Sequence, residues 1–262
     1  MTNGAGSSTG ADGRIGTSGV VPADWNAPSH VHAFCTTRAG GVSRPPFDTM
    51  NLGLHVGDES AAVIENRRRL MALNALPTVP AWLRQVHGTR IVPAEGIADS
   101  VPADGCWTDA PGRSIAVMTA DCLPVVLCDA AGSRVAVVHA GWRGLAAGVL
   151  EAALEVFAAG QPLHAWLGPA IGADAFEVGA EVRDTFVRRR AGHAAAFRPA
   201  AVAGKYLCDL YALARDELTA YRWISVSGGE HCTFTERERF HSHRRDGTAS
   251  GRMATVAWLA AR

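Results

Sequence analysis

Two short apolar runs near the middle of the chain constrain its fold more than any other feature. Residues 115–119 (IAVMT) and 123–128 (LPVVLC) are separated by only Ala120, Asp121 and Cys122. Apolar runs of this length that are rich in Val, Ile and Leu are typical of buried strands. The pair therefore predicts two core strands joined by a tight connection, with Cys122 at the point where one ends and the next begins.

The other expected elements alternate irregularly between strands and helices. Further strands are expected at residues 30–37, 134–139, 223–227, 239–243 and 253–259. Helices are expected at residues 60–73, 145–158, 180–190 and 207–221. This order favours a layered α/β fold with mixed β-sheets over a strict doubly wound sheet. At 262 residues, one such domain is the simplest organisation.

Composition bears on the domain boundaries and on the environment of the protein. The first 20 residues are almost all small or polar, so we expect a flexible tail over residues 1–22 and one folded domain over residues 23–262. The net charge of zero gives no attraction to nucleic acid or to an anionic membrane. Six scattered cysteines, no apolar N-terminal segment and no run of about 18 apolar residues indicate a cytoplasmic protein with reduced thiols.

Two histidines and one cysteine stand in short motifs beside glycines or at the ends of expected strands. The motifs are QVHG at 85–88, ADCL at 120–123 and HAGWRG at 139–144. Taken singly, His87, Cys122 and His139 are each more often ordinary core residues than ligands. Together they form a His2Cys set, which a catalytic zinc ion uses with its fourth position open. None belongs to a short-range pattern such as CxxC, so the fold itself would have to assemble the site.

These motifs and several others make the chain resemble the YfiH family. The additional motifs are TTRAGGVS at 36–43, MNLG at 50–53, HVGD at 55–58, LGPAIG at 167–172, FEVG at 176–179, RRD at 244–246 and GRM at 251–253. Members of the family carry laccase-domain or polyphenol oxidase names and were later associated with purine nucleoside phosphorylase activity. The resemblance extends over about residues 30–260.

The resemblance implies a fold, a metal site and a reaction. The implied fold has α/β/β/α layers, and the implied zinc ligands are His87, Cys122 and His139. The implied activity is phosphorolysis of adenosine, inosine and methylthioadenosine, with adenosine deamination as a further activity. The partners would therefore be a purine nucleoside and phosphate.

One motif departs from the family pattern. Residues 240–246 read FHSHRRD, whereas the family usually has Phe-Phe-Ser-Tyr-Arg-Arg-Asp. His241 and His243 thus replace two aromatic rings, a change that bears on substrate preference if the family tyrosine contacts the base.

Other residues are candidates for binding or proton transfer. Asp121 and Glu177 are candidates for proton transfer, although a structural role is equally ordinary for a carboxylate. Guanidinium groups bind phosphate with two hydrogen bonds, and the candidates beside glycines or in the motifs above are Arg38, Arg143, Arg244 and Arg252. Each of these arginines is as readily a solvated surface residue. Asn51 could bind a ribose hydroxyl or stabilise its own turn.

Three other functions fit parts of the sequence. A copper oxidase would use the two His-x-His pairs at 30–32 and 241–243, but a multicopper cluster needs more such pairs; copper could also occupy the proposed zinc site. A cysteine hydrolase would use Cys122 as nucleophile with His139 or His87 as base. A metal-stabilised binding module would need a fourth protein ligand, for which His55 is the nearest candidate.

Overall fold

Two stacked β-sheets form the centre of this computed structural model, which describes residues 19–97 and 99–261. The first sheet is antiparallel, with its strands in the order β1 (Val20–Pro22), β2 (Val31–Thr36), β13 (Met253–Leu259) and β5 (Ile115–Thr119). The second is mixed, in the order β12 (Ile224–Gly228), β8 (Leu163–Leu167), β6 (Leu123–Asp129), β7 (Val135–Ala140), β4 (Gly105–Thr108) and β3 (Ile91–Pro93). In the second sheet β12–β8 and β3–β4 are parallel pairs.

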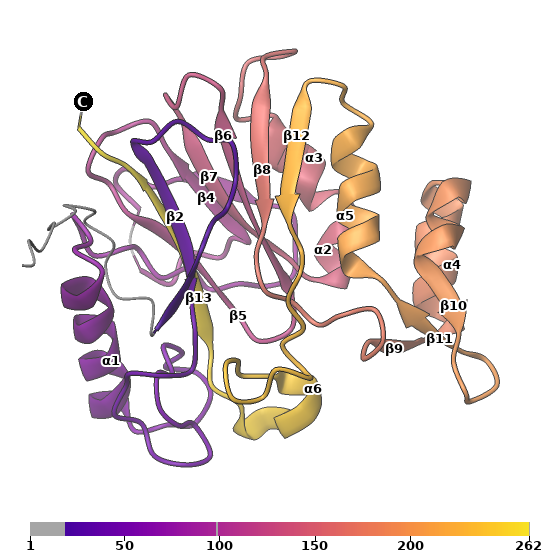
Figure 1. The fold of residues 1–262 in the computed structure, drawn as a ribbon, viewed down its shortest axis with the longest axis horizontal. Coiled ribbons are helices and arrows are strands. Elements are labelled where there is room, and N and C mark those ends of the chain that lie inside the picture. The colour runs from indigo at the N-terminus through magenta and orange to yellow at the C-terminus, as the bar shows by residue number, and fades with distance from the viewer. Residues whose placement is uncertain (1–18, 98, 262) are drawn as a thin grey trace, which may run out of the picture.

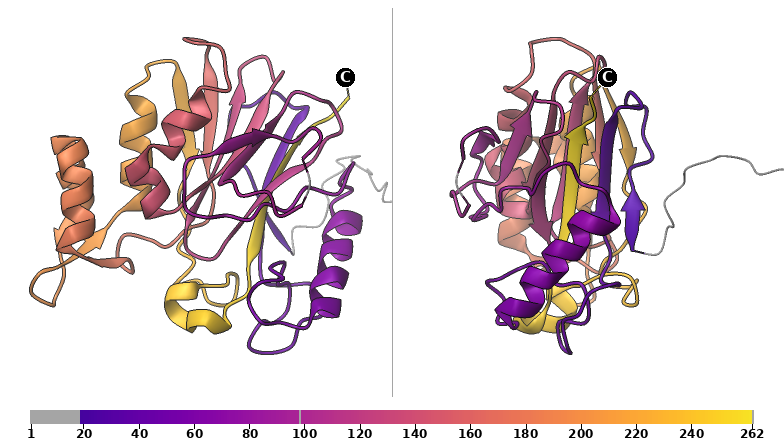
Figure 2. Two further views of the ribbon diagram at one scale, coloured as in Figure 1. Left: turned by 180° about the vertical axis from the view of Figure 1, so that it is seen from behind. Right: turned by 90° about the vertical axis from the view of Figure 1, so that its left-hand side faces the viewer.

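Helices cover the outer face of each sheet (Figures 1 and 2). On the four-stranded sheet lies α1 (Ser60–Leu73), whose Leu70 is packed in one apolar cluster with Phe34 and Val256. On the six-stranded sheet lie α2 (Trp142–Ala147), α3 (Val149–Leu154) and α5 (Leu210–Thr219). This arrangement confirms the α/β/β/α layers and the mixed sheets expected from the sequence.

The two apolar runs of the sequence belong to different sheets. Residues of β5 such as Val117 face Val126 of β6 and Val137 of β7 across the space between the sheets, where they are fully buried. Because β5 and β6 are joined by residues 120–122 alone, the chain crosses from one sheet to the other in three residues. Cys122 therefore lies at a junction between the two layers.

A smaller lobe lies at one side of the molecule (Figure 1). Its three strands have the order β10 (Phe197–Pro199), β11 (Lys205–Cys208) and β9 (Glu177–Gly179), and α4 (Ala180–Arg189) packs beside them. The remaining short helices are η1 (Ala191–Ala196), α6 (His243–Asp246) and η2 (Gly247–Ala249).

Three local expectations are wrong. The helix expected at 145–158 is divided into α2 and α3, because Gly148 has a φ of 95° that interrupts the helical backbone. The strand expected at 239–243 is a loop leading into α6, because the Ser242 hydroxyl accepts the Arg245 amide and caps the start of that helix. Most of the expected tail, residues 1–18, lies outside the described residues, but Val20–Pro22 form β1 and pair with β2.

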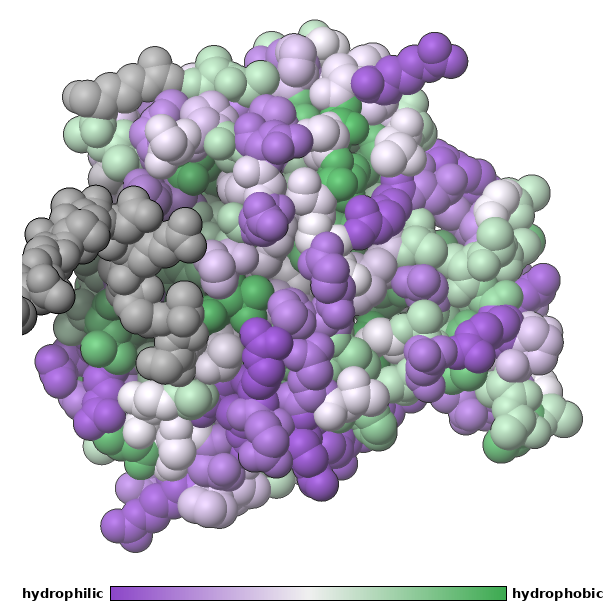
Figure 3. All heavy atoms as spheres, viewed as in Figure 1, coloured by the Kyte–Doolittle hydropathy of each residue, from purple (hydrophilic) through white to green (hydrophobic). Residues whose placement is uncertain are grey.

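The described part of the chain has polar side chains around α6 and six unpaired cysteines. Figure 3 shows polar side chains gathered over α6 and the loop before it, while apolar side chains form small separate groups on that face. All six cysteines are free thiols. Among the helices of the described residues, none combines the length and apolar character that crossing a bilayer requires.

Candidate metal centre

Three side chains from three separate segments converge on one point. The donor atoms of His87, Cys122 and His139, here called the donor triplet, lie within 4.8 Å of one another. Cys122 Sγ is 3.9 Å from His87 Nε2, and the two imidazole rings meet edge to face with centroids 4.7 Å apart. His87 comes from the loop before β3, Cys122 from the β5–β6 junction and His139 from the end of β7. The grouping expected from the sequence is therefore present.

A buried carboxylate fixes the loop that carries His87. Asp104 is fully buried and accepts hydrogen bonds from the backbone amides of Val86, His87 and Gly88 at 2.7–3.3 Å. These amides point the same way because His87 has a φ of 60°, in the left-handed region. Three donors on one carboxylate hold this strained turn in a single conformation.

The same carboxylate orients the second histidine. His139 Nδ1 donates to Asp104 Oδ1 at 2.9 Å, and the His139 amide donates to the Asp104 carbonyl at 2.7 Å. When the ring is neutral and its proton is on Nδ1, Nε2 carries the lone pair on the side of Cys122. This carboxylate–histidine arrangement is the one that supports metal-ligating histidines in general.

The third ligand is positioned by the junction between the sheets. Asp121, which precedes Cys122, has a φ of 86°. Its carboxylate accepts the hydroxyls of Thr233 and Ser242 and the amide of Arg244, at 2.6–3.1 Å. These contacts tie the junction to the start of α6, so Asp121 acts on the site by holding its parts together.

The electrostatics of the site favour a thiolate at Cys122. Burial alone would raise the pKa of this thiol, but His139 and His87 outweigh it and lower the pKa to about 6. Burial likewise opposes a charge on His139, whereas Cys122 and Asp104 raise its pKa to about 9. By contrast, burial raises the pKa of the Cys35 thiol to about 12. A thiolate is the form that binds a metal ion.

The space around the donor triplet also fits a bound ion. A Cβ placed on Gly141 would lie 2.9 Å from Cys122 Sγ and 3.0 Å from His87 Cδ2. Gly141 has φ −64° and ψ 160°, which any residue can adopt, so its backbone does not require glycine. Glycine is required instead by the lack of space for a side chain beside Cys122 and His87. Two imidazoles, one thiolate and an open side match the donor set of a catalytic zinc site.

Replacing Gly141 with alanine should therefore weaken metal binding by roughly 10- to 100-fold, because the new methyl group displaces the ligands. The dissociation constant is measured by competition with a chelator. The control is Gly192→Ala, since a Cβ at Gly192 meets nothing within 4 Å. Equal affinity in the two variants would show that Gly141 does not protect the site.

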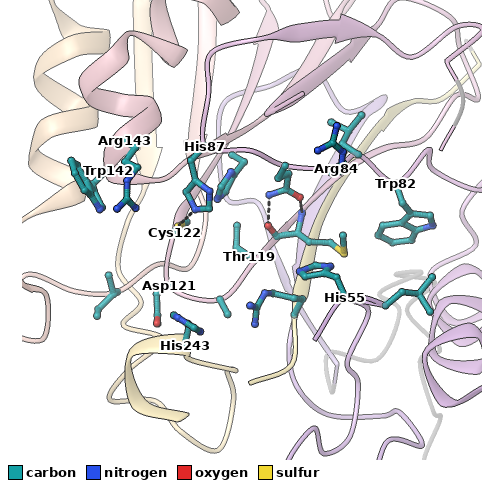
Figure 4. A pocket seen from close by; sticks show the side chains of 18 of the residues that line it. His55, Trp82, Arg84, His87, Thr119, Asp121, Cys122, Trp142, Arg143 and His243 are labelled. Atoms are coloured by element: carbon teal, nitrogen blue, oxygen red, sulfur yellow. Dashed lines mark hydrogen bonds between the residues drawn. The ribbon is translucent and has the colours of Figure 1, made fainter. Parts of the chain in front are cut away.

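The donor triplet lines a cavity of about 880 Å³. This volume is ample for a ligand of nucleoside size. Figure 4 shows Trp142 and Arg143 on one side of the His87–Cys122 pair, and His55, Arg84 and Trp82 on the other. The lining includes five arginines but only two aspartates, so the cavity suits an anionic or phosphate-bearing ligand. The arginines are Arg67, Arg84, Arg143, Arg244 and Arg252.

Four of the other candidate residues from the sequence reach this cavity. Arg143 stacks on Trp142 with 4.5 Å between guanidinium carbon and ring centroid, and Arg244 stacks on Phe176 at 5.1 Å. Arg252 and Asp121 also belong to the lining. These side chains are available to a ligand near the donor triplet.

Three candidates lie outside the cavity lining and have partners elsewhere. The Arg38 guanidinium donates to the carbonyl and carboxylate of Asp48. The Asn51 side chain is fully buried and accepts the backbone amides of Gly53 and Arg252, the structural role that the sequence left open for it. Glu177 lies in β9, where its carbonyl accepts a hydrogen bond from Arg244.

His241 and His243, which replace aromatic rings of the family motif at residues 240–246, have different surroundings. His243 is exposed and lines the cavity (Figure 4). His241 is fully buried, and neither of its ring nitrogens has a hydrogen-bond partner among the described residues. Burial and the charge of Arg38 lower the pKa of His241 to about 3. His241 therefore fills the place of an aromatic ring in the core as a neutral imidazole.

Because His241 is buried as a neutral ring, it should make the folded protein less stable as the pH falls. The substitution His241→Phe should remove this contribution. Below pH 6.5 the unfolded chain binds a proton at His241 that the folded protein does not bind until about pH 3. The group therefore costs the folded state ~1.4 kcal/mol per pH unit as pH falls through this window. Between pH 7 and pH 5, we expect the wild type to lose about 2 kcal/mol more than the variant in urea unfolding with chelator present.

The control for this comparison is His243→Tyr, which changes an exposed ring in the same motif. It should keep the wild-type pH dependence. An identical loss of stability in wild type and His241→Phe would contradict the assignment.

Several functional residues were not expected from the sequence. Asp104 and Gly141 support the donor triplet, and Arg67, Trp82 and Trp142 line the cavity. No spacing rule links Asp104 to either histidine, since the link depends on β4 and β7 being neighbours. Gly141 carried a partial signal, as it follows His139 closely in a glycine-rich motif.

Comparison with known proteins assigns the family. A family model described as multi-copper polyphenol oxidoreductase laccase matches residues 32–260. The chain belongs to this laccase-domain (YfiH) family. It is 51% identical over 237 residues to a purine nucleoside phosphorylase of Pseudomonas aeruginosa, covering 90% of this chain and 96% of that protein. It is 50% identical over 242 residues to the purine nucleoside phosphorylase YfiH of Escherichia coli K12, covering 92% and 98%.

Solved structures of the family share the fold. The crystal structure of a Neisseria meningitidis protein superposes with a TM-score of 0.86 at 46% identity, covering 93% of this chain and all of that one. YlmD from Geobacillus stearothermophilus gives a TM-score of 0.83 at 31% identity, covering 95% and 98%. The resemblance to the YfiH family inferred from the motifs is thus confirmed.

The family description names copper, whereas the site resembles a mononuclear centre. Within residues 19–97 and 99–261, the donor triplet is the only group of three or more side chains that could hold a metal ion. The His-x-His pairs do not add to it, since His32 stacks on Trp258 and His241 is buried outside the cavity lining. A second group of three donors for a further copper ion is absent from this part of the chain.

Proposed function

We propose that this protein is a zinc-dependent purine nucleoside phosphorylase that acts on adenosine, inosine and methylthioadenosine and also deaminates adenosine. The observation that carries the proposal is the donor triplet, held by Asp104 at the wall of an arginine-rich cavity. Relatives that are 45–51% identical carry the name purine nucleoside phosphorylase and match this chain over about nine-tenths of its length. We also propose that the protein, a single domain that includes β1, acts in the cytoplasm.

The proposed zinc ligands are His87, Cys122 and His139. When bound, zinc in such a site supplies Lewis acidity, which polarises a substrate oxygen or lowers the pKa of a water molecule. Asp104 keeps the ring of His139 in the tautomer that ligation requires. The affinity order of divalent ions means that copper competes for the same ligands.

In phosphorolysis, a phosphate oxygen forms a bond to C1′ of the ribose while the C1′–N9 bond breaks. The purine leaves with the bonding electrons and takes up a proton. The protein must hold the phosphate against C1′ and stabilise the charge that develops on the departing base. The guanidinium groups in the cavity lining are the groups that can bind the anion.

The proton that the purine takes up needs a donor in the cavity. The sequence suggested Asp121 or Glu177 for this step. Asp121 already accepts three hydrogen bonds, and Glu177 lies outside the lining, so we assign both to positioning. His243 is exposed in the lining and is the imidazole best placed to exchange a proton with a bound base.

Adenosine deamination would use the same cavity. Water adds at C6 of the purine, the C6–N6 bond breaks, and ammonia leaves with the proton that the water lost. This reaction needs no phosphate. The two reactions can therefore be separated by their requirement for phosphate.

The test is a product assay on purified protein with known metal content. Base release from inosine only when phosphate is present would support phosphorolysis, and inosine formation from adenosine without phosphate would support deamination. Zinc should be present at about one ion per chain. Absence of both products with the zinc-loaded protein would overturn the proposal.

A cysteine hydrolase is the second candidate, because one observation favours it. Cys122, His139 and Asp104 form a thiol–imidazole–carboxylate series in which Asp104 holds Nδ1 and leaves Nε2 toward the thiol. A hydrolase needs only one imidazole beside the thiol, whereas here His87 converges on the same point. Turnover of amides or thioesters by metal-free protein, with no turnover of nucleosides by the zinc-loaded form, would favour this candidate.

A further inference from the structure

Three basic side chains lie together in the cavity, apart from Trp142 and Arg143. We call His55, Arg67 and Arg252 the basic cluster; all three line the cavity. A Cβ built on Gly53 would lie 2.8 Å from Arg252 Cγ and 3.4 Å from His55 Cε1, so both side chains lie over this glycine. Arg67 reaches the neighbouring peptide, where its Nε and Nη2 donate to the Leu52 carbonyl at 3.0 and 2.8 Å. The cluster is therefore gathered over residues 52–53.

The backbone beneath the cluster is held firmly. The buried Asn51 side chain accepts the amides of Gly53 and Arg252, which joins the loop to the start of β13. The Leu52 amide donates to the Arg252 carbonyl at 3.0 Å. Arg67 is packed flat on Trp82, with its guanidinium carbon 4.0 Å from the ring centroid. The basic groups are thus placed before any ligand arrives.

Within residues 19–97 and 99–261, neither guanidinium of the cluster has a carboxylate partner. The guanidiniums of Arg67 and Arg252 donate hydrogen bonds to the backbone carbonyls of Leu52, Ser250 and Gly251. No ion pair with an acidic side chain joins either of them in that part of the chain. Burial lowers the pKa of both arginines, and burial with their two charges lowers that of His55. Guanidiniums gathered without counter-charge favour an anion.

Two acidic groups act on the cluster from its edges. Asp99 raises the pKa of Arg67 by its charge, but its Oδ1 accepts the Trp82 amide. The charges of Cys122 and Asp121 act in the same sense on the pKa of Arg252, although burial lowers it overall. Both carboxylates are engaged with backbone or hydroxyl donors, so neither closes the cluster to a ligand.

We propose that the basic cluster of His55, Arg67 and Arg252 is the subsite for a tetrahedral phosphate-type oxyanion, either free phosphate or the phosphoryl group of a larger ligand. For free phosphate the assignment rests on the proposed phosphorylase function, and it places the anion on the opposite side of the donor triplet from Arg143. The ligand that is cleaved then occupies the side lined by Trp142, Arg143 and Phe176, where aromatic faces suit a purine.

The experiment compares two pairs of arginine variants in the zinc-loaded protein. Arg67→Met and Arg252→Met remove charges from the cluster while keeping apolar bulk. Arg143→Met and Arg244→Met remove charges from the other side. Arg68→Met is the control, since Arg68 is exposed on α1 next to Arg67 and pairs with Glu65. Each protein is assayed for KM of phosphate and of inosine, for metal content and for melting temperature.

We expect KM for phosphate to rise roughly 10- to 100-fold in each cluster variant, with KM for inosine and metal content nearly unchanged. Arg68→Met should match the wild type. A rise confined to Arg143→Met or Arg244→Met would overturn the assignment. If Arg67→Met does not fold, His55→Gln replaces it, because the His55 side chain is exposed and lies over Gly53.

Direct titration with inorganic phosphate, and separately with inosine monophosphate, distinguishes the two sources of the oxyanion. Loss of phosphate binding in Arg252→Met would support a free-phosphate subsite. If Arg252→Met instead binds inosine monophosphate no more tightly than inosine, while its binding of free phosphate is unchanged, the cluster is a phosphoryl subsite for a larger ligand. Unchanged binding of both would refute the cluster as an anion site. These titrations remain decisive even if the wild type shows no phosphorolysis, which would count against the proposed function instead.

Discussion

Replacing Cys122 with serine should abolish stoichiometric metal binding and lower nucleoside turnover by about 10³-fold or more, a loss of ~4 kcal/mol in transition-state stabilisation. A serine hydroxyl is not ionised near neutral pH, whereas the Cys122 thiol, with its pKa lowered to about 6 despite burial, supplies an anionic ligand. The remaining donors, His87 and His139, would form a two-histidine site with no negative charge. Metal content by elemental analysis and turnover of inosine with phosphate measure the two effects.

The control for this variant is Cys232→Ser. Cys232 is likewise partly exposed, but it accepts the Gly172 amide and lies outside the cavity lining. It should retain metal and activity. A Cys122→Ser or Cys122→Ala protein that keeps both zinc and full turnover would refute the metal site. Full turnover by metal-free wild type, lost in Cys122→Ser, would instead identify Cys122 as a nucleophile.

The sequence was most informative where a property depends on a short stretch of chain. The helix at 60–73 and the strands at 115–119 and 253–259 are found at their expected bounds, since apolar pattern and propensity act locally. The donor triplet was found because each ligand stands in a recognisable motif. By contrast, the sheet to which each apolar run belongs depends on long-range pairing, which the runs themselves do not encode.

The parts of the site that were missed depend on contacts between distant segments. Arg38 and Arg67 are similar as isolated arginines, yet one pairs with Asp48 outside the cavity and the other lines it. His241 and His243 are two residues apart, but His241 is buried in the loop before α6, whereas His243 is the first residue of α6 and lines the cavity. The expected strand at 239–243 failed because a serine cap, a single hydrogen bond, outweighed the local pattern.

Replacing Asp104 with asparagine should also weaken metal binding strongly, because this one carboxylate positions both histidine ligands. Its Oδ1 accepts the His87 amide at 2.8 Å and His139 Nδ1 at 2.9 Å, and its Oδ2 accepts the Gly88 amide at 2.7 Å. In Asp104→Asn one of these oxygens becomes an NH2 group. If the NH2 faces His139, the ring must move its proton to Nε2 and loses the lone pair that binds metal. If it faces Gly88, two donors meet and the His87 loop is released.

Either orientation should weaken metal binding by roughly 10- to 100-fold, with a matching loss of turnover at limiting metal. Chelator competition measures the affinity, and nitrogen NMR of the His139 ring reports which nitrogen carries the proton. The matched control is Asp109→Asn, in which a half-exposed carboxylate that pairs with Arg134 is changed in the same way. Asp104→Asn should lower metal affinity far more than Asp109→Asn does. Wild-type affinity together with an unchanged His139 tautomer would mean that the backbone alone positions the two histidines.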